Sequence, residues 1–177
     1  MSENAQVSVW RATGDDLNPH FTIRHRVFVV EQRALEYTDL DKRDLDPNTV
    51  HVLAAHGDQA SGTVRLYPLE GGTWQGDRLA VLPSHRSTMV GAELVRFAVA
   101  WAASRGGHVM RAQIQLPNVR FFERLGWARF SDPAPYCGFD HQPMIINLAK
   151  TPDLHWPPRP EALFLEETMS VPGLLAG

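Results

Sequence analysis

The spacing of hydrophobic residues changes several times along the chain, and each change marks a predicted element. Residues 7–12 alternate between apolar and polar side chains, which predicts a short strand. Residues 17–32 have mostly helical spacing, and we expect Pro19 to divide this helix into two pieces. Apolar runs at 51–56 and 63–68 flank a turn and predict a pair of strands.

The second half of the chain alternates strand and helix patterns. We expect a polar, glycine-rich loop at 69–76, a strand at 77–83, and then a helix that ends at Gly106 and Gly107. The remaining predicted elements are a strand at 108–114, a helix at 117–125, and strands at 127–130 and 143–148. Strands followed by alternating helices and strands indicate an α/β domain, in which helices flank a mixed sheet.

The stretch 36–49 between the two halves is highly charged and predicts a solvated loop. A site for a cationic amine or a hard metal ion is the alternative, because the stretch contains Asp39, Asp41, Asp44 and Asp46. His51 and His56 are five residues apart on one predicted strand, so their side chains point to opposite faces and are not expected to share a metal. We therefore expect no metal site.

Composition narrows the class of protein. At 177 residues and 44% hydrophobic content, the chain is long enough for one core. A net charge of −3 excludes a dedicated nucleic-acid binder, which normally carries a basic surface. Cys137 is the single cysteine, no apolar run reaches bilayer length, and the start MSENAQ has no signal-peptide pattern. These features predict a soluble, cytoplasmic protein that does not bind membranes.

The last 27 residues differ from the rest, since they hold five of the 13 prolines. We expect one domain over 1–150 and a Pro-rich extension over 151–177. Trp156 and Phe164 are too apolar for a free linker, so the extension should lie along the domain or along a partner subunit, which would make a homodimer.

The start of the helix after residue 85 raises a question of chemistry. Gly91 and Ala92 place almost no side chain in its first turn. A helix N-terminus has unpaired amides and positive partial charge, and small residues would let a diphosphate reach them, with Arg86 adding a charged contact. Close packing of the helix against a strand is the alternative explanation.

Neighbouring residues make the pattern more specific. RLAVLPSHRSTMVGAEL (78–94) resembles the coenzyme-binding segment of the GNAT superfamily of N-acetyltransferases, with Met89 where that family has a glycine. A side chain there could force a different backbone angle. PNVRFFERLGW (117–127) is similar to the family's second signature. RHRVFVVEQ (24–32) and CGFDHQPMIINL (137–148) resemble the ElaA branch, and the layout also resembles acetyltransferases of nitrogen-starvation gene clusters.

The resemblance implies a GNAT fold in which strands around Leu79–Val81 and Arg111–Gln113 splay apart and pair with acetyl-CoA. A backbone amide at Val81 or Leu82 would hold the thioester oxygen. The expected coenzyme-binding residues are Leu79, Ala80, Val81, Arg86, Ser87, Thr88, Met89, Val90, Gly91, Ala92, Asn118, Phe121, Phe122 and Arg124.

The implied reaction is acetyl transfer from acetyl-CoA to a small-molecule amine in one ternary complex. Glu31 is the first candidate for the general base and His141 the second. Phe122 stands where many relatives have an acidic tyrosine, so Tyr136 becomes the candidate acid. Two alternatives stay open: an enzyme like the acyl-homoserine-lactone synthases, and a non-catalytic acyl-CoA sensor.

Overall fold

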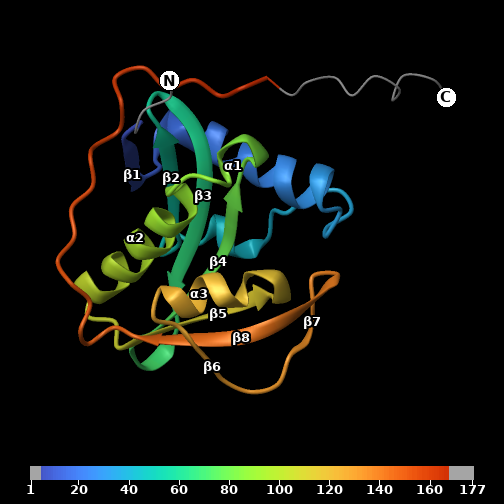
Figure 1. The fold of residues 1–177 in the computed structure, drawn as a ribbon, viewed down its shortest axis with the longest axis vertical. Helices are drawn as coiled ribbons and strands as arrows, with labels where there is room; N and C mark the ends of the chain where they lie inside the picture. Colours follow the sequence, from blue (N-terminus) through green and yellow to red (C-terminus); the bar gives the residue numbers. More distant parts are fainter. Residues whose placement is uncertain (1–4, 168–177) are drawn as a thin grey trace.

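Residues 5–167 are described by the computed structural model, and they form an eight-stranded sheet flanked by helices (Figure 1). The strand order is β1-β2-β3-β4-β5-β8-β6, with β7 also paired to β8. All neighbours are antiparallel except the parallel pair β4–β5, so the sheet is mixed as predicted. The strands are β1 Val7–Arg11, β2 Val50–His56, β3 Gln59–Pro68, β4 Thr73–Val81, β5 Val109–Gln115, β6 Ala128–Arg129, β7 Ala134–Tyr136 and β8 Phe139–Asn147.

Helices cover both faces of this sheet. α1 (Leu17–His25) runs directly into a π-helical turn, Arg26–Glu31, while α2 (Val90–Ser104) and α3 (Val119–Arg124) lie on the other face (Figure 1). β2 shows how the sequence specifies both faces. Val52 and Ala54 belong to the core under α2, whereas Leu53 packs in a second core with Ile23 of α1. The two-residue period of the strand places them on opposite sides.

Two predictions about where helices and strands begin and end are wrong. Pro19 does not divide the first helix, because it lies in the first turn of α1, where the missing amide costs no intrahelical hydrogen bond. The loop predicted at 69–76 ends at Gly72, and β4 starts at Thr73. Gly71 and Gly72 have φ of 68° and 77°, so they make the tight turn alone and leave the polar residues after them to pair with β3.

Strand boundaries also differ from the expectations. β3 begins at Gln59 and β8 at Phe139, each four residues earlier than predicted, and the short strand β7 was not predicted. Backbone pairing extends these strands into polar residues near turns. Hydrophobic alternation does not detect such extensions, because they contain polar or small residues such as Gln59, Ser61 and Gln142 even where the side chains are buried.

The predicted solvated loop at 36–49 is tied down by buried ion pairs. Arg24, which is fully buried, bonds Asp39 at 2.6 Å and Asp44 at 2.8 Å. Arg65, 1% exposed, bonds Asp41 at 2.7 Å and Asp44 at 3.0 Å. Burial alone would raise the pKa of Asp44, but the hydrogen bond from Arg24 holds it well below the ordinary value. Asp39, Asp41 and Asp44 therefore hold this loop to the rest of the domain through ion pairs.

The C-terminal segment (151–167) runs along the rest of the described chain (Figure 1). Trp156 Nε1 donates to Glu93 of α2 at 2.8 Å. Phe164 exchanges backbone hydrogen bonds with the β2–β3 turn, and Ser84 donates to the Glu166 carboxylate at 3.0 Å. The last part of the predicted extension, 168–177, lies outside the described residues. The division at residue 150 and the homodimer stay predictions.

Candidate functional site

The central strands β4 and β5 separate after a short stretch of pairing. Their parallel register covers Thr73 to Gln75 on β4, and the last pair is Gln75 with Arg111. Beyond it, β4 continues beside β3 and β5 beside β8. A register shift in the β3–β4 ladder and the positive φ of 51° at Arg78 bend β4 away. The edges 76–81 and 112–115 thus face each other across a gap, which confirms the predicted splayed pair.

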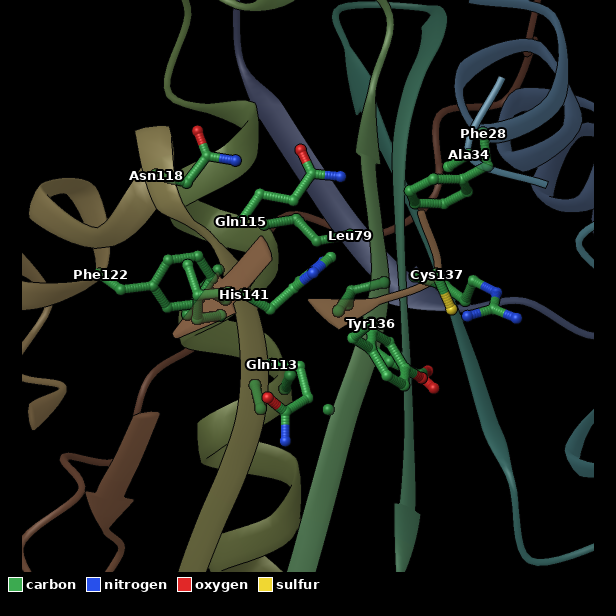
Figure 2. Close-up of a pocket in the computed structure, with 18 of the residues that line it drawn as sticks. Phe28, Ala34, Leu79, Gln113, Gln115, Asn118, Phe122, Tyr136, Cys137 and His141 are labelled. Atoms are coloured by element: carbon green, nitrogen blue, oxygen red, sulfur yellow. The ribbon is translucent and has the colours of Figure 1, made fainter. Parts of the chain in front are cut away.

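A cavity of about 130 Å³ occupies this gap. Its outer wall includes Phe28, Gln32, Leu35, Tyr136 and His141, and Figure 2 shows His141 lying between Phe122 and Tyr136. Its inner wall consists of buried apolar side chains contributed by β3, α2, β5 and the short connection between α3 and β6. These are Val64, Val95, Ala98, Met110, Ala112 and Trp127.

The first turn of α2 offers free amides beside this cavity. The N–H groups of Ser87, Met89, Gly91 and Ala92 donate to no backbone acceptor among residues 5–167. Met89 has φ −79° and ψ 0°, an ordinary conformation for any residue. Met89 therefore sits in this loop without a positive φ, and the expectation that it changes the backbone angle relative to a family glycine stays a prediction.

Gly91 is not required by packing. A Cβ placed there would meet only Phe121 Cζ at 3.6 Å and Val81 Cγ2 at 3.7 Å, which are ordinary contacts. At Gly62 of β3, by contrast, a Cβ would lie 2.8 Å from Leu94 of α2. Close packing of α2 on the sheet thus depends on Gly62, and the open space at Gly91 is left for another purpose.

Two predicted site residues, Glu31 and Arg86, meet outside the cavity. The Arg86 guanidinium forms an ion pair with the Glu31 carboxylate and donates to the Val81 carbonyl at 3.0 Å. Glu31 ends the π-helical turn and does not line the cavity. Its role as the base and the contact of Arg86 with phosphate stay predictions, and each would require this pair to separate.

The other two catalytic candidates lie together in the cavity wall. His141 is 5% exposed, and its Nδ1 lies 2.8 Å from the Phe139 carbonyl. A carbonyl only accepts, so Nδ1 carries a proton and the neutral ring keeps its lone pair on Nε2. The Tyr136 ring packs edge-on against His141, with ring centroids 5.2 Å apart. Burial, together with nearby Cys137, raises the pKa of the Tyr136 hydroxyl.

The four predicted coenzyme-binding residues in and just before α3 lie in three different places. Asn118 and Phe122 line the cavity, Phe121 packs beside Gly91, and Arg124 is exposed at the end of the helix, away from the cavity. Phe122 packs edge-on against Trp127, 5.4 Å between centroids, and has no hydroxyl to donate a proton. On β4, Leu79 lines the cavity, whereas Ala80 faces α1.

The turn between β7 and β8 closes the cavity from one side, and sequence reasoning missed it. Cys137 and Gly138 have φ of 47° and 82°, the signs of a two-residue type I′ hairpin turn. A Cβ on Gly138 would lie 3.3 Å from the Ala34 carbonyl, so the turn packs closely on the segment after the π-helical turn. The same wall is joined by Gln115, which donates to Gln32 at 2.9 Å.

The sequence gives little indication of this hairpin turn, because the turn residues are Cys-Gly rather than the common Asn-Gly. It gives none of the hydrogen bond between Gln115 and Gln32, because the two residues are 83 positions apart. Within residues 5–167, no group of three or more His, Cys, Asp or Glu side chains is placed to hold a metal. No helix of this part of the chain is long and apolar enough to cross a bilayer.

Comparisons with known proteins agree with this geometry. The model of the acetyltransferase (GNAT) family matches residues 12–127. The Bacillus subtilis N-acetyltransferase YjcF is 29% identical over 120 residues, 67% of this chain and 82% of YjcF. Two solved structures share the fold at 20% identity and TM-score 0.68. Escherichia coli ElaA aligns over 79% of this chain and 97% of its own. The CoA-dependent acyl-homoserine lactone synthase BjaI, solved with SAM and isopentyl-CoA, aligns over 82% and 84%.

Because the family model covers well over half of the chain, this protein belongs to the acetyltransferase (GNAT) family and is an N-acetyltransferase.

Proposed function

We propose that this enzyme transfers the acetyl group of acetyl-CoA to the amine of a small molecule, with both substrates bound at once. The observation that carries the proposal is the combination of two unpaired strand edges with a helix start whose amides are free and whose Gly91 is not needed for packing. A pantetheine chain fits the first feature by strand addition, and a diphosphate fits the second.

The thioester of the coenzyme supplies an activated acyl group, and the backbone of β4 would hold its oxygen. Of the two amides expected to do so, the amide of Leu82 donates to the Ser61 carbonyl at 2.9 Å. In an antiparallel ladder, adjacent residues turn their amides to opposite sides, so the amide of Val81 points away from β3 toward the gap. Val81 is therefore the proposed donor to the developing oxyanion.

His141 is the proposed general base. With Nδ1 held by the Phe139 carbonyl, Nε2 is the free acceptor of a buried imidazole in the cavity wall. The amine nitrogen loses a proton to Nε2 as it attacks the thioester carbon, and the carbon–sulfur bond then breaks. Glu31 would need to leave Arg86 before it could do the same.

Tyr136 is the proposed source of the proton for the departing thiolate. Its raised pKa keeps the hydroxyl protonated at neutral pH, and it lies against His141, so acid and base share one wall. A thiolate is already a fair leaving group, and loss of the phenol should reduce turnover modestly.

Binding and chemistry can be tested separately. Acetyl-CoA at 100 times its dissociation constant should stabilise the enzyme by about 2.7 kcal/mol in thermal unfolding. Gly91→Ala should fold and still bind, because the added Cβ fits, whereas Gly91→Trp should fold but lose the stabilisation. Equal stabilisation of the Trp and Ala variants would place the phosphates elsewhere.

Release of free thiol on mixing with a panel of small amines tests transfer. Binding with no release from any amine would favour the non-catalytic sensor. Release that requires a methionine-derived nucleotide would favour the lactone-synthase alternative. A panel of proteins carrying free lysines provides the control for acceptor size.

A further inference from the structure

The cavity between β4 and β5 reaches deeper than a surface groove. Its inner wall includes Val95 and Ala98 of α2, Val64 of β3 and Met110 of β5, which are 4%, 2%, 5% and 1% exposed. Side chains this buried belong to the main core under α2. A space in contact with all of them therefore extends from the open gap into the layer between the sheet and α2.

Small residues keep this inner end open. Gly76, Ala98 and Ala112 line it from three different elements. A Cβ on Gly76 would lie 3.4 Å from the Met110 sulfur, at the edge of ordinary contact, and methionine is a flexible neighbour. Packing does not require a glycine at position 76, and the missing side chain leaves the inner end of the cavity open.

The cavity as a whole, with the open gap and the inner end together, has a volume of about 130 Å³. For comparison, an engineered apolar cavity of about 150 Å³ in another protein binds benzene, a group of six carbons. Acetyl adds only one methyl group beyond the thioester carbonyl. Unfilled apolar space is unusual in protein interiors, because the lining atoms lose their contacts.

The cavity offers no free charge to the group that fills it. Asp77 and Arg78 line it, but the Asp77 carboxylate is held by Arg65 at 2.6 and 2.7 Å. The Arg78 guanidinium donates to the Asp39 carbonyl at 3.0 and 3.2 Å. A carboxylate entering among Val64, Ala98 and Met110 would lose its hydration without a partner.

We propose that the preferred donor is a coenzyme A thioester of an uncharged acyl group with four to six carbons, whose apolar end lies among Val64, Ala98 and Met110. This inference rests on the proposed function, because it takes the gap between β4 and β5 as the coenzyme site. It changes the preferred donor from acetyl-CoA, which the proposed function names, to a thioester of a longer apolar acyl group, and it excludes dicarboxylic acyl groups.

The affinity of the enzyme for different acyl-CoA donors, measured with no amine acceptor present, tests the proposal. Dissociation constants of coenzyme A and of acetyl-, butanoyl-, hexanoyl- and succinyl-CoA can be determined by titration calorimetry. Each buried methylene should tighten binding about fourfold. Hexanoyl-CoA has four more methylenes than acetyl-CoA and should therefore bind about 250-fold more tightly if all four are buried, and about 16-fold if only two are. Succinyl-CoA should show no gain over acetyl-CoA.

Variants on α2 locate the effect. Ala98→Leu should fill the inner end and remove the gain for hexanoyl-CoA while leaving the affinity for coenzyme A unchanged. Ala100→Leu is the matched control, since Ala100 is on the same helix and does not line this cavity. Gly76→Ala, which the contact distances permit, gives a second filling variant if Ala98→Leu does not fold.

The outcomes separate the two claims. If the enzyme binds coenzyme A and acetyl-CoA, but chain length has no effect or succinyl-CoA binds as tightly as butanoyl-CoA, the donor inference is wrong and the proposed function stands. If Ala100→Leu removes the hexanoyl-CoA gain as fully as Ala98→Leu, the inference is also wrong. If neither coenzyme A nor any thioester binds, the proposed function itself fails.

Discussion

Replacing His20 should flatten the acid dependence of stability, because this histidine is buried in its neutral form. Its Nδ1 donates to the Val52 carbonyl at 3.0 Å, which leaves Nε2 as an acceptor facing Arg24 at 3.4 Å and His51 at 3.2 Å. A second proton on His20 would meet the Arg24 guanidinium. Burial first, and then the charge of Arg24, lower the pKa of His20 from 6.5 to about 3.

The sign and size follow from linkage. The unfolded chain takes up a proton on His20 below pH 6.5, and the folded chain does so only near pH 3. The stabilisation from neutral His20 is thus complete above pH 6.5 and is lost as pH falls through the window down to about 3. For this one residue, the free energy of unfolding should be about 2 kcal/mol lower at pH 5 than at pH 8.

The assay is urea unfolding at pH 8, 6.5 and 5, followed by circular dichroism. His20→Gln should be less stable than the parent at pH 8, but its loss between pH 8 and pH 5 should be smaller by about 2 kcal/mol. His155→Gln, at an exposed position on the C-terminal segment, is the control and should keep the parental dependence. An identical drop in the His20→Gln variant and the parent would refute the reasoning.

Three further changes have directions set by the structure. Arg24→Met removes the shortest ion pair of each of two buried carboxylates, leaving Asp39 to Arg78 and Asp44 to Arg65, and should lower the free energy of unfolding by about 3 kcal/mol in urea; a loss below 1 kcal/mol would show the Arg24 ion pairs to be dispensable. His141→Gln should reduce turnover at least 100-fold, whereas Glu31→Gln should leave turnover close to that of the parent; the reverse result would make Glu31 the base. Truncation after residue 150 removes the contacts of Leu163 and Leu165 with the second core and should lower the free energy of unfolding by about 2–4 kcal/mol. Thermal unfolding should show this as a lower midpoint temperature, and an unchanged midpoint would show that the segment contributes nothing to stability.

The fold was predictable from sequence where a motif or a period extends over many residues. The segment 78–94 has both, and its strand, loop and helix lie where they were expected. Pro19 and the loop before β4 were misjudged for a common reason. Helix interruption depends on the exact turn in which a proline falls, and strand pairing recruits polar residues that hydrophobic alternation does not mark.

The site divides in the same way. Gly91 and Asn118 were found because local motifs contain them, but the Gln32–Gln115 bridge and the buried pairs of Arg24 with the loop at 36–49 join residues distant in sequence. Charge patterning alone favoured solvent for that loop, since nothing local reveals that two arginines of other elements reach it. Only the three-dimensional arrangement brings His141 and Tyr136 to one wall and leaves Glu31 with Arg86.

The C-terminal segment contacts residues on both sides of the proposed coenzyme site. Glu166 receives the Ser84 hydroxyl and, through its backbone carbonyl, the Arg26 guanidinium. Ser84 stands just ahead of the loop that presents the free amides, and Arg26 begins the turn that ends at Glu31. Proteolytic trimming, or a bulky tag that displaces this segment, would therefore disturb the loop proposed to bind the phosphates, and enzymes purified with different C-terminal tags should differ in donor affinity before they differ in turnover.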